Sequence, residues 1–199
     1  MSVAKSRKLH RSGLLLTLLF LMAAPGLLFA QSDSEKATRI ALGAVSGSFK
    51  SQVMIPLFLT PYPPENPVGS ISATIEYPSK GLTFVKAEKS FLLDGVNGGF
   101  EVKAEKDPKD PAKSLIHVEV STKGEPRKPL REGLALTLLF RIEPDAPAGK
   151  TVTLALQNAA AQTTDSPPKP IKPLVTKNGT IEIVAPEGVP YVGCFFFSH

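Results

Sequence analysis

The sequence has little of the chemistry that most enzymes use. Its 199 residues contain one cysteine, three histidines and no tryptophan. His10 and His199 lie near the two ends, and His117 stands alone in a stretch of alternating residues. A nucleophilic triad or a metal-activated water needs several convergent groups, so we predict no catalytic residue, no metal ligand and no cofactor. We expect His117 to be a solvent-facing strand residue rather than a catalytic base.

Three polar patterns allow a chemical interpretation beside a simpler one. Glycosidases need two carboxylates across a cleft, but the candidates lie at turns and strand ends: Asp94, Glu101, Glu143 and Asp145. Residues 94–99 contain calcium-ligand types without the spacing of a helix-loop-helix site, which favours a turn. Asn178-Gly179-Thr180 fits the glycosylation pattern, which a bacterial protein usually leaves unused, so we interpret it as a turn before the last strand.

The first 30 residues have the order of a secretory signal peptide. Basic residues precede an apolar run from Leu14 to Ala30, which Pro25 interrupts. A basic start, an apolar stretch and a small final residue are typical of a cleaved, helical leader, and we expect cleavage after Ala30. An uncleaved membrane anchor is the alternative, because the run has the lower limit of a spanning length. We expect export to the periplasm, the cell surface or the medium, with membrane contact only through this leader.

Removal of the leader changes the charge of the chain. The leader holds four of the 23 Lys and Arg and none of the 18 Asp and Glu, which leaves 19 against 18. The basic pI of about 9.3 is therefore largely a property of the leader, and nucleic acid loses its electrostatic support as a partner. The rest is long enough for one domain. Cys194 has no partner within the chain, so we expect the core to hold the fold.

After a polar lead-in at residues 31–37, apolar residues recur with a period of two. This period is typical of half-buried strands, and proline and glycine at the joints indicate turns. The pattern predicts an all-β, two-sheet antiparallel sandwich. We interpret the proline-rich residues 165–173 as a long loop rather than a linker. About nine strands are expected, at residues 39–45, 53–59, 71–77, 82–87, 100–104, 116–120, 134–142, 152–156 and 181–183.

The segment 185–199 forms an apolar C-terminal tail, which includes Cys194, Phe195, Phe196 and Phe197. It is too short to span a membrane. One interpretation is that the tail packs on the sandwich or is simply disordered, and we favour it. The other is an exposed apolar handle for a partner, in which Cys194 forms an intermolecular disulfide.

Several strand patterns resemble those of cohesin-type domains. Val53–Leu57 is similar to the family's strand that runs into Val-Pro-Val, and Ile71–Tyr77 followed by Gly81–Phe84 is similar to its next pair of strands. Leu136–Ile142, with Ala146 and Gly149 after it, resembles the family's Phe-containing strand and Ala-x-x-Gly turn. Gly179–Ile183 resembles the closing Gly-x-Ile-x-Ile, whereas Pro78 stands where the family has Asp.

This resemblance covers residues 38–184 and implies a nine-stranded jelly-roll sandwich. It implies a non-catalytic module that binds a dockerin-like module of another exported protein on an outer sheet face, in polysaccharide-degrading or cell-surface assemblies. Direct polysaccharide binding on the same fold is the alternative, although the scarcity of Trp and Tyr weakens it. A shallow apolar patch on the outward face of the long strands would favour a protein partner, and aligned aromatic rings would favour sugar.

Overall fold

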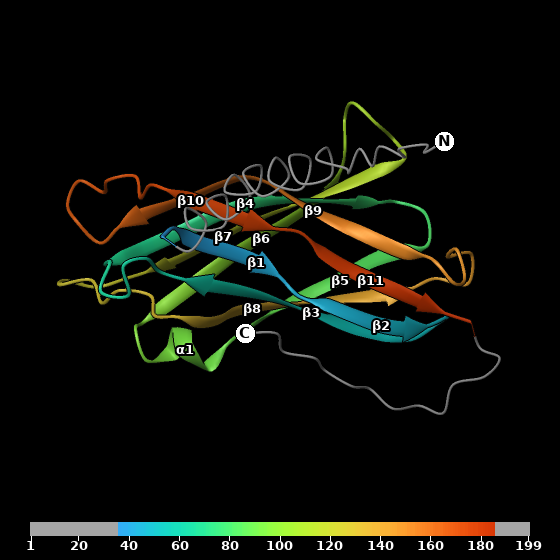
Figure 1. Cartoon of the computed structure of the whole chain (residues 1–199), viewed down its shortest axis with the longest axis horizontal. Helices are drawn as coiled ribbons and strands as arrows, with labels where there is room; N and C mark the ends of the chain where they lie inside the picture. Colours follow the sequence, from blue (N-terminus) through green and yellow to red (C-terminus); the bar gives the residue numbers. More distant parts are fainter. Residues whose placement is uncertain (1–35, 186–199) are drawn as a thin grey trace, which may run out of the picture. The chain divides into compact units, whose positions relative to one another are not determined.

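The structure is a computed structural model that describes residues 36–185, with eleven strands and one short helix in that range (Figure 1). The expected leader at residues 1–30, nearly all of the lead-in, and the tail residues Cys194 and Phe195–Phe197 lie outside the described residues. No helix within residues 36–185 has the length and apolar character that crossing a membrane requires.

The strands form two sheets. The five-stranded sheet has the order β10-β1-β3-β8-β5, and the six-stranded sheet has the order β2-β11-β9-β4-β7-β6. The elements are β1 (Thr38–Leu42), β2 (Ala44–Ser48), β3 (Gln52–Thr60), β4 (Val68–Pro78), β5 (Leu82–Lys89), α1 (Phe91–Asp94), β6 (Gly98–Lys106), β7 (Lys113–Thr122), β8 (Gly133–Ile142), β9 (Thr151–Thr163), β10 (Leu174–Lys177) and β11 (Gly179–Val184).

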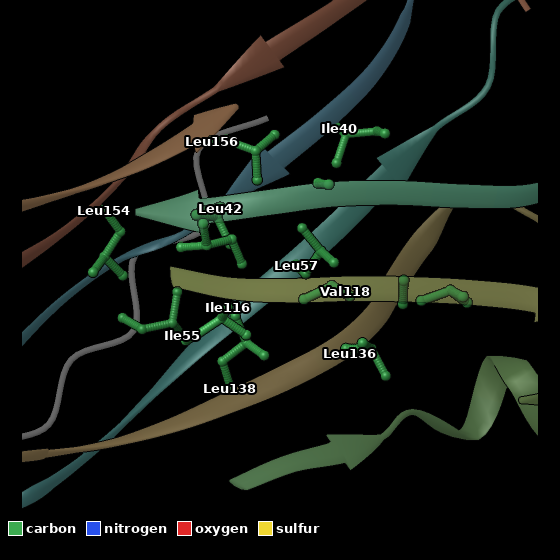
Figure 2. Packing of buried hydrophobic residues seen from close by; sticks show 14 of the residues in the cluster. Ile40, Leu42, Ile55, Leu57, Ile116, Val118, Leu136, Leu138, Leu154 and Leu156 are labelled. Atoms are coloured by element: carbon green, nitrogen blue, oxygen red, sulfur yellow. The ribbon is translucent and has the colours of Figure 1, made fainter. Parts of the chain in front are cut away.

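The alternating apolar residues build the core between the sheets, as the sequence predicted. Figure 2 shows buried side chains of β1, β3 and β8 gathered with those of β7 and β9. Phe140 is fully buried, and its ring meets Tyr77 and Phe84 edge-on at centroid distances of 5.2 and 5.7 Å. Because every second side chain of a strand is used in this way, the remaining ones form two outer faces.

The two ends of the described chain run side by side and cross from one sheet to the other together. β1 continues into β2 at Gly43, and β10 continues into β11 at Asn178 (Figure 1). Each segment pairs with the other in parallel, β1 with β10 and β2 with β11. A Cβ on Gly179 would lie 2.8 Å from the carbonyl oxygen of Gly43, so the crossing needs glycine.

This crossing corrects the expectation of a purely antiparallel sandwich. The remaining strand pairs are antiparallel, but the terminal segments can be parallel because the whole domain connects them and no hairpin does. The expected strand at residues 39–45 is split between the sheets, and β10 was not expected, which accounts for eleven strands in place of nine. The sequence-predicted loop at residues 165–173 folds back on β9, where Ile171 donates to the Ala161 carbonyl at 2.8 Å.

Candidate functional site

The outward side chains of β9, β4, β7 and β6 form a surface that we call the polar face. Cross-strand rows run over it: Lys103 lies opposite His117, which lies opposite Thr74. Among the described residues, no aromatic side chain belongs to these outward positions. The polar members are Ser70, Ser72, Thr74, Glu76, Glu101, Lys103, Glu105, Lys113, His117, Glu119, Ser121, Gln157 and Gln162.

A shallow hollow of about 350 Å³ lies in the middle of the polar face. A bulge in β9 shapes it: Ser72 pairs with Ala160 while Thr74 pairs with Gln157, so β9 carries an extra residue at this point. Asn158 has a φ of 49° there, a left-handed conformation that asparagine tolerates better than most residues. The residues that line this polar hollow are Ser72, Ala73, Thr74, Glu101, Val102, Lys103, His117, Val118, Glu119 and Asn158.

His117 is held in the hollow from both sides of its ring. Nε2 lies 3.2 Å from a carboxylate oxygen of Glu105, and Nδ1 lies 3.1 Å from the hydroxyl of Thr74. Since a carboxylate accepts, the neutral ring donates from Nε2 and accepts the Thr74 hydroxyl at Nδ1. The imidazole is thus a fixed wall of the hollow, on the solvent side of the sheet as predicted, with hydrogen bonds that the sequence did not reveal.

Ion pairs neutralise most of the charge around this ring. Lys103 Nζ lies 2.6 Å from Glu105, and this hydrogen bond, followed by the one from His117, lowers the pKa of the Glu105 carboxyl. At the neighbouring end of the face, Glu76 accepts from Lys113 at 2.9 Å and raises the pKa of that ammonium group. Gln157 donates to the other Glu76 oxygen at 3.3 Å.

Glu101 and Glu119 are the exception on the polar face. They stand directly opposite each other on β6 and β7, both exposed, and no ion pair neutralises either one within the described chain. Like charges in directly opposed cross-strand positions destabilise a sheet. Beyond Glu119 the same row continues into the small side chains of Ser72 and Ala160, which leaves space above the carboxylates. This pair of carboxylates therefore adds no stability to the fold.

The outward side of the five-stranded sheet has the opposite character. Met54 pairs with Leu139, and Phe58 pairs with both Leu134 and Ala41. With Pro56 these residues form a surface that we call the outer apolar patch, and Met54 is 45% exposed. On the β5 side of the patch the charged residues are paired with each other, Lys86 with Glu88 at 2.7 Å and Arg141 with Glu143 at 2.9 Å. On the other side, Lys177 of β10 lies beside Ala41.

The other residues singled out from the sequence are dispersed. Asp94 ends α1 and pairs with Lys89 at 2.6 Å, and residues 95–97 form the predicted turn. Glu143 lies beyond β8, on the other sheet from Glu101, where Thr83 and then Arg141 lower the pKa of its carboxyl. No group of three or more His, Cys, Asp or Glu in the described residues could hold a metal ion.

Asn178 has a structural role that the glycosylation pattern did not indicate. Its side-chain oxygen accepts a hydrogen bond from the Leu156 amide at 2.9 Å, where the chain crosses between the sheets. The predicted simple turn is therefore a sheet-to-sheet crossing tied to β9.

Several solved structures with this architecture are cohesins. The third cohesin of ScaC from Acetivibrio cellulolyticus, solved with the ScaB dockerin, has a TM-score of 0.60 at 16% identity and covers 74% of this chain and 99% of its own. The fold is that of a cohesin domain. A non-cellulosomal cohesin from the archaeon Archaeoglobus fulgidus has a TM-score of 0.57 at 22% identity, with 75% and 93% covered. A type I cohesin–dockerin complex from Clostridium thermocellum has 0.57 at 20% identity, with 74% and 94% covered.

At these identities the likeness establishes the cohesin fold, and the sequence resemblance is confirmed at that level. No protein-family model matches the chain, and no curated protein matches it significantly.

The polar hollow was not found from the sequence, although a signal for it is present. Apolar residues alternate through Val152, Leu154 and Leu156, and the next inward residues are Ala159 and Ala161. The interval of three marks an extra residue in the strand, which is the pattern of a β-bulge.

Proposed function

We propose that this cohesin-fold chain is an exported, non-catalytic binding module that recognises a protein partner through the polar face. The solved cohesins that share the fold include several in complex with dockerins. By this analogy the partner is a dockerin-like module of another exported protein, in an assembly linked to polysaccharide degradation or to the cell surface.

The polar face has the dimensions of a protein interface. Its four strands are 9 to 13 residues long. With strands about 4.8 Å apart and about 3.3 Å per residue, it extends about 20 by 30 Å. That projected area of about 600 Å² approaches the roughly 800 Å² that each partner contributes to a standard interface.

The opposed Glu101 and Glu119 carry this proposal. Evolution tolerates a destabilising contact at binding sites because the partner resolves it, and a Lys or Arg side chain placed above Ser72 would neutralise both carboxylates. The fixed His117 ring and the bulge at Asn158 give the hollow a defined shape, so the partner is expected to insert a long basic side chain there. Charges arranged in this way contribute specificity and association rate.

Direct polysaccharide binding remains the alternative with less support. Sugar-binding surfaces rely on aromatic rings that stack on pyranose faces, and the polar face has none among its described residues. The partner chemistry suggested by two unpaired carboxylates is a cation, which neutral polysaccharides do not offer.

The test is capture of proteins from culture supernatant by the full chain, in parallel with retention on insoluble polysaccharide. Glu119→Lys is the test variant, and Glu88→Lys is its control, because it makes the same charge change on the opposite sheet. We expect the unmodified chain and the control to retain one protein partner that Glu119→Lys loses. Retention on polysaccharide without a protein partner would overturn the proposal.

A further inference from the structure

We propose that the outer apolar patch is the docking site of the chain's own C-terminal tail, residues 189–197. The patch lies on the outer side of the five-stranded sheet, opposite to the polar face. Contiguous apolar surface of this kind on a protein is normally covered by something, and the tail is the segment of this chain whose composition and starting point fit.

The chemistry of the patch fits an apolar and uncharged occupant. Met54, Phe58, Leu134 and Leu139 supply its apolar side chains, and the charged residues on its β5 side already form ion pairs with each other. From Gly188 to His199 the tail contains no Lys, Arg, Asp or Glu, and it brings Val189, Pro190, Tyr191, Val192 and three phenylalanines. An occupant of this composition would bring no charged side chain of its own to the patch.

The starting point of the tail also fits. β11 ends at Val184, which pairs in register with Ser48 at the end of β2. Ser48 leads through a tight turn, closed by the bond from the Ser51 amide to its carbonyl, into β3 at Gln52. The tail therefore leaves the sandwich at the end where β3 begins, and β3 begins two residues before Met54.

The length suffices for this path. The sheets of a sandwich lie about 10 Å apart, and the four residues from Met54 to Phe58 span about 13 Å. Eleven extended residues, from Val184 to Phe195, reach about 36 Å. The chain can pass around the end of the sandwich and lie along β3 with Tyr191 to Phe197 over the patch. Since β3 and β8 are interior strands with satisfied backbones, the contact is made by side chains.

Cys194, the single cysteine, makes the proposal testable in the full chain. A second cysteine is introduced at Met54→Cys or at Leu134→Cys, the two ends of the patch, and the matched control is Ser72→Cys on the polar face. A disulfide needs Cα atoms within about 7 Å. After mild oxidation at low protein concentration, peptide mapping should find an intrachain disulfide from Cys194 to at least one patch position and none to Ser72→Cys.

A second variant tests whether the phenylalanines hold the tail in place. Adding Phe195→Ser, Phe196→Ser and Phe197→Ser to the cross-linking chain should lower the disulfide yield at least about fivefold. Equal yields at all three cysteine positions, or disulfide-linked dimers without the intrachain product, would overturn the proposal. The dimers would support the alternative of an exposed handle that pairs with another molecule. Because Met54 is highly exposed, its substitution leaves the core intact and the test usable.

Discussion

Glu119→Lys should stabilise the isolated domain while it weakens partner binding. Opposed cross-strand residues have Cβ atoms about 5 Å apart, and two unit charges about 6 Å apart in water interact with an energy close to RT. Replacing the repulsion between Glu119 and Glu101 by an attraction changes stability by about 2 RT. For a domain of this size the melting temperature should rise by about 2 to 4 °C.

Differential scanning calorimetry at low and high salt measures this effect. At about 1 M salt the screening length falls to about 3 Å, so the rise should shrink below about 1 °C. Glu119→Gln removes the repulsion without adding an attraction and should give about half of the gain. A melting temperature that is unchanged or lower at low salt would refute the opposed geometry of the two carboxylates. A gain in stability with undiminished partner binding would show that the hollow is not the interface.

Four further substitutions test the fold and its electrostatics. Phe140→Ala should cost about 4 kcal/mol in the free energy of unfolding, measured by urea titration, because this buried ring packs on two others. Gly69→Ala should destabilise by about 2 kcal/mol, since its Cβ would lie 2.7 Å from the Thr163 carbonyl oxygen, whereas Gly99→Ala meets nothing nearer than 3.7 Å and should be neutral or slightly stabilising. Glu105→Gln should lower the melting temperature near neutral pH. Because the folded pKa of Glu105 is below its usual 4.5, that contribution is complete above pH 4.5 and disappears as the pH falls through the folded pKa.

The sequence predicted the strands wherever one face of a strand is buried. Ile71, Ala73 and Ile75 on β4 keep a strict period of two, and each is buried. The split of the first strand at Gly43 was missed although the inward apolar residues pass from Leu42 to Val45, an interval of three. Only tertiary contact decides which sheet each half joins. β10 was missed because its four residues alternate too briefly to distinguish them from a loop.

The candidate site was less predictable than the fold, for a physical reason. Outward side chains are constrained by cross-strand register, and register depends on bulges that shift one strand against its neighbour by a single residue. The sequence placed His117 on the solvent side, but its contacts with Thr74 and Glu105 follow from the register of three strands. Glu101 and Glu119 lie 18 positions apart in the sequence, and their opposed placement becomes apparent only when β6 is aligned with β7.

The contrast between the two outer faces argues for a division of tasks between the sheets. Both faces come from the same alternation of inward and outward side chains. Packing of the core does not dictate which residue types occupy the outward positions. On the five-stranded sheet the outward positions of β3 and β8 include the apolar side chains of the outer apolar patch, and the charges on its β5 side are paired with each other. This surface suits a permanent cover. On the six-stranded sheet they are polar, hollowed and burdened with two uncompensated carboxylates. Such a surface is stable in water without a partner, and a bound cation would relieve the repulsion between the two carboxylates. Both properties are needed for reversible binding of a partner.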